Sequence, residues 1–243
     1  MNVAIIIARG GSRRLPRKNV RPLCGHPLIA WSIVQAINSS EIDYVVMATD
    51  DDEIEEISLS YGVNEVIRHP VWVENAIRTF VYALKDLQNR DLFFDSVISL
   101  LPPAPLRMPG DLDRMLITHA TNGSQSTIAM CRPTEFVLYK DAGFNVCRSQ
   151  ILDKEGKYLL NALGARVYHP ELLMNYESRM SDLKVSEADV ESLAGFDSFF
   201  FTEVAPWQVY ETDTLEDFEL CEVLMNHYIL KGKSMEDVYA ITS

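Results

Sequence analysis

Residues 3–19 read VAIIIARGGSRRLPRKN, and this stretch decides the fold that we expect. Its first six residues are continuously apolar, which is typical of a buried strand. Two glycines, one serine and five cationic side chains follow in residues 9–19. Glycine allows a ligand to come close to outward-pointing N–H groups, and arginine and lysine donate to phosphate oxygens. Because α/β sheets bind ligands at the carboxyl ends of their strands, the pattern predicts a polyanion site.

Positive charge is concentrated in this loop against an acidic background. The 243 residues carry a formal net charge of −13, yet six of the 22 lysines and arginines lie within residues 9–21. We therefore expect a nucleoside triphosphate to bind there. The spacing is neither that of a Walker A box (G-x-x-x-x-G-K-[ST]) nor that of the dinucleotide fingerprint G-x-G-x-x-G. The alternative is a solvated basic loop without a ligand.

Composition bounds the class of protein. With 47% hydrophobic and 23% charged residues, the chain has the balance of one globular domain, residues 1–243. The acidic net charge argues against a nucleic-acid partner, and no apolar stretch approaches the roughly 20 residues that span a bilayer. The first apolar run is too short for a signal peptide, so we expect a cytoplasmic protein. The four cysteines and five histidines are scattered, which argues for reduced thiols and against zinc.

Strand-like and helix-like segments alternate along most of the chain. This rhythm predicts an α/β fold, a Rossmann-like three-layer sandwich with a mainly parallel sheet. It breaks at about residues 132–166, where we expect an inserted β-hairpin subdomain. Such a segment often makes a dimer contact, although periodicity alone does not show it. The predicted strands are 3–8, 44–48, 63–67, 96–100, 125–130 and 199–204, and the predicted helices are 27–38, 51–61, 75–87, 111–120 and 213–230.

Residues 5–33, IIIARGGSRRLPRKNVRPLCGHPLIAWSI, resemble the opening motif of the cytidylyltransferases that make CMP-activated acidic sugars. The similar enzymes are the CMP-sialic, CMP-legionaminic and CMP-pseudaminic acid synthetases. Weaker resemblances follow at residues 48–50, 68–79, 105–107, 164–165 and 211–214. The resemblance implies a homodimer that joins CTP to the anomeric hydroxyl of a nine-carbon keto-acid sugar (a nonulosonate) and releases pyrophosphate.

The resemblance also implies roles for individual residues. Lys18, Arg9 and Asp213 are the expected catalytic residues, with Lys18 neutralising charge near the reacting phosphate. Arg14 and Arg17 are expected either to support the loop or to be solvated. The expected nucleotide-binding residues are Ala8, Arg9, Gly10, Gly11, Ser12, Arg13, Lys18, Asn19, Asp50, Arg68 and Thr79.

Glu211 and Asp213 are the expected ligands of a Mg²⁺ cofactor. In an extended segment, residues two apart point to the same side, and two carboxylates with phosphate oxygens suit this hard cation. The family's element usually carries two aspartates, so Glu211 is a departure from it. The alternative is a helix N-cap at Asp213, with Glu216 at the third helical position. Asp50 likewise has the alternative of a turn or helix cap.

The acceptor side of the expected site departs further from the family. Residues 101–104 read LPPA where relatives often carry glutamine, threonine and serine, which predicts an altered acceptor pocket. One alternative acceptor is another keto-acid sugar, such as 3-deoxy-manno-octulosonate. The other alternative is a non-catalytic homologue that only binds nucleotide. The expected sugar-binding residues are Leu101, Arg107, Lys140, Arg148, Gln150 and Arg166.

Overall fold

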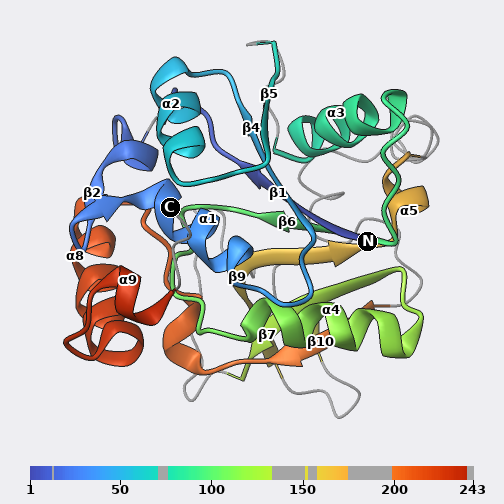
Figure 1. Cartoon of the computed structure of the whole chain (residues 1–243). Coiled ribbons are helices and arrows are strands. Elements are labelled where there is room, and N and C mark those ends of the chain that lie inside the picture. Colours follow the sequence, from blue (N-terminus) through green and yellow to red (C-terminus); the bar gives the residue numbers. More distant parts are fainter. Residues whose placement is uncertain (13, 71–75, 133–150, 153–157, 175–198, 240–243) are drawn as a thin grey trace, which may run out of the picture.

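The computed structural model describes residues 1–12, 14–70, 76–132, 151–152, 158–174 and 199–239. They form an α/β fold around one mixed, mostly parallel sheet (Figure 1). The strand order is β10-β7-β9-β6-β1-β4-β5, and β8 pairs with β9 at the margin. The strands are β1 (Asn2–Ile7), β4 (Tyr44–Thr49), β5 (Glu65–Arg68), β6 (Ser96–Leu100), β7 (Ser126–Cys131), β8 (Ile151–Leu152), β9 (Tyr158–Tyr168) and β10 (Phe199–Glu203).

The parallel strands fix where a ligand can bind. β1 pairs in parallel with β4 and β6, and β4 with β5, so their carboxyl ends share one edge. β10 runs parallel to β7. The basic loop leaves this shared edge, directly after β1. The structure therefore confirms that the apolar run is a strand of a parallel part of the sheet and that the glycine loop follows at its carboxyl end.

β9 corrects the predicted boundary of the inserted segment. We expected hairpins through residue 166, but β9 lies inside the main sheet, antiparallel to both β6 and β7. The short β8 does form a hairpin with the start of β9. Residues 133–150 and 153–157 of the predicted insert lie outside the described residues, and its role in dimerisation stays a prediction.

Helices cover both faces of the sheet and make three layers (Figure 1). On one face, apolar side chains of β1 such as Ile6 pack with α1, α2 and α4. On the other face, neighbours such as Ile5 pack with α3 and α5. Successive side chains of a strand point to opposite faces, which explains why every residue of this run is buried. The helices are α1 (Leu28–Ile37), α2 (Asp52–Ser60), α3 (Ala76–Asn89), α4 (Asp111–Asn122) and α5 (Pro170–Met174).

A third apolar cluster joins the hairpin after the basic loop to the helices of the C-terminal part of the chain. The hairpin of β2 (Pro22–Leu23) and β3 (His26–Pro27) packs with α8 (Leu215–Leu224), the π-helix η3 (Met225–Leu230) and α9 (Met235–Val238). Trp31 of α1 is fully buried at its centre, and its indole N–H donates to the Leu23 carbonyl at 2.9 Å. The short 3-10 helices η1 (Lys18–Val20) and η2 (Pro206–Val209) lead into this cluster from the loop and from β10.

His119 makes the stability of this fold depend on pH. It is buried on α4, where the hydroxyls of Thr127 and Ser124 lie 3.2 Å from its Nδ1. Burial, followed by the nearby His169, lowers the pKa of His119 from 6.5 to about 4. Between these two values the unfolded chain binds more protons than the folded protein, so the free energy of unfolding falls as pH falls through this window.

We expect the wild type to lose about 2 kcal/mol more unfolding free energy than His119→Gln between about pH 7.5 and about pH 5. Glutamine keeps a polar group for the two hydroxyls but does not titrate. Urea unfolding of both proteins at the two pH values measures the difference. Equal losses in the two proteins would show that His119 is not the group responsible.

Candidate nucleotide and acceptor site

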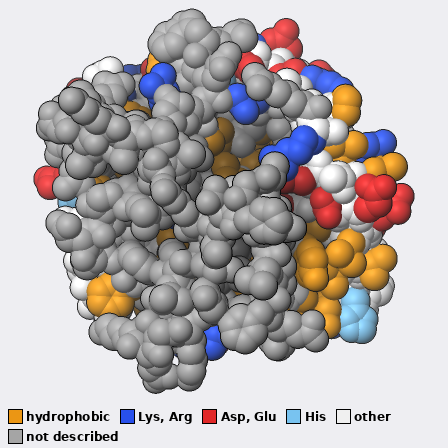
Figure 2. All heavy atoms as spheres, turned by 180° about the vertical axis from the view of Figure 1, so that it is seen from behind, with side chains coloured by type: hydrophobic (Ala, Val, Ile, Leu, Met, Phe, Trp, Pro, Cys, Tyr) orange, Lys and Arg blue, Asp and Glu red, His pale blue; other side chains and the backbone are white. Residues whose placement is uncertain are grey.

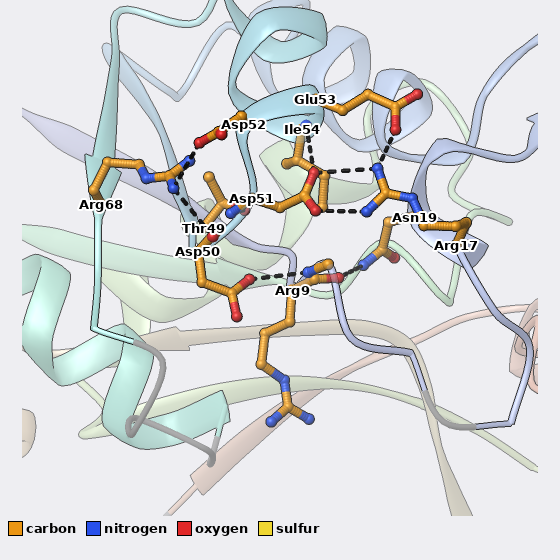
Figure 3. Close-up of polar contacts among 11 residues, drawn as sticks. Arg9, Arg17, Asn19, Thr49, Asp50, Asp51, Asp52, Glu53, Ile54 and Arg68 are labelled. Carbon is orange, nitrogen blue, oxygen red and sulfur yellow. Dashed lines mark hydrogen bonds and ion pairs between the residues drawn. The ribbon is translucent and has the colours of Figure 1, made fainter.

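Hydrogen bonds from neighbouring elements hold the glycine loop against the carboxyl edge of the sheet (Figure 3). The Gly10 N–H donates to the Asp50 carboxylate at 2.9 Å, and the Asn19 amide donates to the Arg9 carbonyl at the same distance. The Arg9 side chain extends away from the acidic residues at the start of α2, Asp51, Asp52 and Glu53 (Figure 3). The Ala8 N–H donates to the Ala48 carbonyl and its side chain is buried, so neither group is available to a phosphate, and contact of Ala8 with a nucleotide stays a prediction.

Acidic residues at the start of α2 fasten the far end of the loop. Asp51 caps α2 through the Ile54 N–H at 3.0 Å and also accepts from the Arg17 guanidinium at 2.5 and 3.2 Å. Arg17 also pairs with Glu53 and has left-handed backbone angles, φ 55° and ψ 27°. The hydrogen bond from Arg17 lowers the pKa of Asp51. Arg17 therefore shapes the loop, and Asp51 rather than Asp50 is the helix cap.

Asp50 and Arg68 connect the loop to strand β5. Arg68 donates to the Asp50 carbonyl at 3.1 Å and pairs with Asp52 and Glu55 of α2. These contacts place both residues beside the loop at the carboxyl edge (Figure 3). Their direct contact with a nucleotide stays a prediction.

Gly10 is the one loop position where the structure demands a glycine. A Cβ there would lie 2.2 Å from Oδ2 and 2.9 Å from Cβ of Asp51, whereas a Cβ at Gly11 meets nothing within 4 Å. Gly10→Ala must therefore displace Asp51 from its cap and from Arg17. We expect it to lower the free energy of unfolding by about 1–3 kcal/mol.

Gly11→Ala is the matched control, since it adds the same methyl group one residue away. We expect the stability of this variant to stay within about 0.5 kcal/mol of wild type. Urea unfolding of both variants without ligand makes the comparison. Equal stabilities for the two alanine variants would contradict the close approach of Gly10 to Asp51.

An ion-pair cluster joins the loop to the acidic segment far along the chain. The Lys18 ammonium lies 3.1 Å from Asp213 Oδ1, and Arg14 pairs with the other oxygen of the same carboxylate. Lys18 is only 7% exposed, at the start of η1. Two of the predicted catalytic residues thus lie in contact although they are 195 positions apart in the sequence. Because Lys18 is nearly buried, its ammonium can act only on a group that lies beside Asp213.

Glu211 lies beside Asp213 and faces a neighbouring cleft. Restricted hydration there, followed by the negative charge of Asp213, raises the pKa of Glu211. The segment is held by the Thr212 N–H and hydroxyl, which both donate to the Pro103 carbonyl, at 2.7 and 3.1 Å. The acidic pair therefore bridges the basic loop and the cleft.

The helix cap in this segment lies one residue beyond Asp213. Thr214 caps α8 by accepting from the Asp217 N–H at 3.2 Å, and the Asp217 carboxylate accepts from the Thr214 N–H at 3.0 Å. The alternative of a cap at Asp213 with Glu216 opposite it is therefore wrong. Asp213 is left for the cations of the loop.

The cleft beside the loop has a volume of about 280 Å³. Figure 2 shows apolar side chains in a hollow on this side of the molecule, with charged side chains at its margin. The cleft brings together the predicted sugar-binding residues Leu101 and Arg166 with the predicted metal ligand Glu211. The Arg166 guanidinium lies 6.0 Å from the ring centre of Tyr168. The lining residues are Ile7, Ala76, Ile77, Phe80, Ser99, Leu101, Gly164, Ala165, Arg166, Tyr168 and Glu211.

Arg107 and Thr79, which were predicted as ligand-binding residues, expose no side-chain surface in this structure, and contact of either with a ligand stays a prediction. Both are fully buried, and the Arg107 guanidinium donates only to protein oxygens. Thr79 lies on the core-facing side of α3. Arg13, Lys140, Arg148 and Gln150 lie outside the described residues.

Phe80 and Tyr168 are cleft residues that the sequence did not indicate. Both belong to the apolar core around α3, and their rings lie 5.5 Å apart. A buried aromatic residue in a helix or strand carries the same sequence signal whether it fills the core or floors a cleft. The predicted residues Leu101 and Arg166 and the late Gly-Ala element at residues 164–165 pointed to the same cleft.

The acidic pair fits the expected Mg²⁺ in its chemistry. In the described parts of the chain, no group of three or more His, Cys, Asp or Glu is placed to hold a metal ion. A cation there would rest on Glu211 and Asp213 together with ligand oxygens and water, an all-oxygen set that suits Mg²⁺. A divalent cation would also relieve the repulsion that raises the pKa of Glu211.

Fold and site together define an α/β protein with a basic glycine loop at the carboxyl edge of its sheet and a small cleft beside it. The chain belongs to the cytidylyltransferase family, whose sequence pattern it matches over residues 3–233. This is a family of nucleotidyltransferases. Within the described residues, no helix has both the length and the apolar character needed to cross a membrane.

Relatives of named activity resemble the chain over part of their length. It is 36% identical over 130 residues to the CMP-N,N'-diacetyllegionaminic acid synthase of Legionella pneumophila, which covers 50% of this chain and 54% of that protein. It is 42% identical over 109 residues to the pseudaminic acid cytidylyltransferase of Campylobacter jejuni, covering 43% and 47%. The matched part thus spans about half the length of these relatives.

A solved structure supports the fold over nearly the whole chain. The CMP:2-keto-3-deoxy-manno-octonic acid synthetase in complex with CTP superimposes with a TM-score of 0.72, covering 94% of this chain and 99% of that one. Its sequence identity is 21%, so the likeness concerns the fold.

Proposed function

We propose that this protein transfers CMP from CTP to the anomeric hydroxyl of an acidic nine-carbon keto sugar, with release of pyrophosphate. The sugar oxygen attacks the α-phosphorus as the bond to pyrophosphate breaks. The observation that carries the proposal is the Lys18–Asp213 contact, which joins a basic glycine loop to an acidic pair at the mouth of a cleft. The relatives named for legionaminic and pseudaminic acid support the acceptor class.

The loop has the donors that a triphosphate requires. Gly11 can offer its backbone N–H group, and Arg9, Arg14 and Lys18 supply positive charge at the carboxyl end of β1. Phosphate oxygens would take over the cations that now pair with Asp213. Charge develops on these oxygens during transfer, so fixed cations stabilise the transition state more than the ground state.

The adjoining cleft is the proposed acceptor site. Arg166 is a candidate partner for the sugar carboxylate, with a planar fork that matches carboxylate geometry. Glu211 and Asp213 would hold Mg²⁺, which when bound neutralises charge on the phosphates. The two carboxylates also tie the cleft to the loop, so donor and acceptor would meet beside Lys18.

Pyrophosphate release tests the function directly. The protein is mixed with CTP, Mg²⁺ and, separately, N-acetylneuraminate, legionaminate, pseudaminate, the deaminated nine-carbon sugar and 3-deoxy-manno-octulosonate. We expect release with a nine-carbon acid and none when CTP is replaced by ATP. Release with the octulosonate alone would move the acceptor to that class. CTP binding without release from any sugar would favour the non-catalytic homologue.

A further inference from the structure

Arg107 lies outside the cleft, yet it donates to the backbone of the two segments that form one wall of the cleft, the loop after β6 and strand β9. The side chain is fully buried. Its Nε donates to the Leu163 carbonyl at 2.7 Å, and its Nη2 donates to the Leu101 carbonyl at 2.8 Å. Its Nη1 donates to Ser32 and Gln35 of α1, both at 3.0 Å. One guanidinium thus connects α1, the end of β6 and the middle of β9.

These four acceptors are neutral oxygens, which makes Arg107 a costly choice for the core. Burial lowers its pKa to about 10. A charge without a tight ion pair loses hydration that carbonyl dipoles only partly replace. A merely structural role could be filled by apolar packing. The property that an apolar residue lacks is the rigid planar fork, which reaches several carbonyls in fixed directions.

The carbonyl of Leu163 belongs to an unusual kink in β9. Leu163 and Gly164 both have left-handed backbone angles, with φ of 65° and 49°. A branched apolar residue adopts this conformation only when its surroundings impose it. The Nε of Arg107 binds directly at this residue. We take Arg107 to be one of the groups that hold the kink in place.

The kink decides which side chains of β9 face the cleft. Ile128 and Met130 of β7 are two residues apart, but their partners Arg166 and Asn161 on β9 are five apart. Arg166 and Tyr168 line the cleft, whereas Ala162, of the same parity, packs in the opposite core cluster. Without the kink, regular alternation would turn Ala162 toward the cleft side.

The second wall is fitted tightly against the kink. The Leu101 N–H donates to the Gly164 carbonyl at 2.8 Å. A Cβ on Gly164 would lie 2.8 Å from the Ala104 Cβ and 3.2 Å from the Leu101 Cβ. The same loop continues to Pro103, whose carbonyl accepts from Thr212 between the two acidic residues. A shift of this loop would therefore reach both the acceptor wall and the acidic pair.

We propose that Arg107 is a positioning residue, which fixes the acceptor wall of the cleft through the carbonyls of Leu101 and Leu163. The proposal rests on the proposed function in one respect, namely that the cleft receives the acceptor sugar. The glycine loop is anchored separately, through Asp50, Asp51 and Asn19. Changes at Arg107 should therefore affect the acceptor far more than CTP.

Arg107→Lys is the decisive variant because it keeps a cation but loses the fork. We expect kcat/KM for the acceptor, at saturating CTP, to fall about 10- to 100-fold. We expect the Kd of CTP, measured by isothermal titration calorimetry, to stay within about twofold, since the loop has its own anchors. Arg90→Lys is the matched control, because Arg90 pairs with Glu65 and Asp86 on the surface. Its kinetics should equal those of wild type.

The result that would overturn the proposal is a lowered melting temperature with unchanged acceptor kinetics. An equal loss of affinity for CTP and of kcat/KM for the acceptor would overturn it as well. Full activity of Arg107→Lys would also overturn it, because a buried charge without the planar guanidinium would then be enough to position the wall. If Arg107→Lys does not fold, Ser32→Ala serves instead, since it removes one acceptor of the fork outside the cleft. A smaller loss restricted to the acceptor supports the proposal, and unchanged acceptor kinetics overturns it.

Amide hydrogen exchange separates this proposal from the proposed function, since it needs no turnover. In Arg107→Lys we expect faster exchange of the Leu101 amide and of residues 163–165, with β1 and β4 unchanged. If the wild type turns over no acidic sugar while the exchange changes as expected, the proposed function fails but the positioning of the wall by Arg107 is supported. Unchanged exchange of the Leu101 amide would refute the positioning role of Arg107 even in an active enzyme.

Discussion

Lys18→Met is expected to lower kcat by about 10²- to 10³-fold with little change in stability. Methionine keeps the buried stem of the side chain, which is 7% exposed, but removes the ammonium beside Asp213. In the proposed reaction, that ammonium meets phosphate oxygens whose charge grows in the transition state. Its loss should therefore appear in kcat more than in the KM of CTP. Pyrophosphate release under saturating substrates measures the effect.

Lys233→Met is the matched control, because Lys233 is an exposed lysine near the end of the described chain. Its activity should be that of wild type. A Lys18→Met enzyme that is fully folded and fully active would remove Lys18 from the chemistry. It would also leave the Lys18–Asp213 contact as a purely structural ion pair.

The local elements of the fold could be predicted because each has a regular pattern in a continuous stretch. The predicted strand 96–100 coincides with β6, and the predicted helix 27–38 with α1 within a residue at each end. The helix predicted over 213–230 begins two residues later and becomes a π-helix from Met225. Caps and changes of helix type depend on single hydrogen bonds, which periodicity does not indicate.

β9 could not be predicted because its own kink removes the sequence signal. A half-buried strand is recognised by alternation with a period of two. Leu163 and Gly164 interrupt that period, so that Ala162 and Arg166 face opposite sides. The long-range antiparallel pairing with β6 and β7 then fixes a segment that resembles hairpins when read alone.

The candidate site divides in the same way. The loop of residues 9–19 is continuous, so its charge and glycines pointed to the correct edge of the sheet. Arg107 was expected to reach a ligand because residues 105–107 resemble the end of the family's fourth-strand motif. Its burial depends on oxygen acceptors from three elements that are distant in the sequence, and the sequence does not show that these acceptors meet. Asp51 shows the same limit, since its close approach to Gly10 is visible only in three dimensions.

Asp213→Asn is expected to lower kcat by about 10²-fold or more and to raise the Mg²⁺ concentration for half-maximal activity about 10- to 100-fold. Asparagine retains an oxygen toward Lys18 but has no charge for a cation. The change also acts on Glu211, whose pKa is raised first by restricted hydration at the cleft and then by Asp213. Removing that negative charge lowers the pKa of Glu211. The acid side of any pH–rate profile that depends on ionised Glu211 should therefore move to lower pH.

Asp217→Asn is the matched control, four residues further along the same segment. Asp217 belongs to the capping box with Thr214, so its loss should cost about 1 kcal/mol of stability and leave the Mg²⁺ requirement unchanged. Calorimetric titration of Mg²⁺ into the CTP complex gives a readout that does not depend on turnover. If Asp213→Asn binds Mg²⁺ as tightly as the control, the acidic pair is not the cation site. The contact between Lys18 and Asp213 would then have to be explained by orientation of the lysine alone.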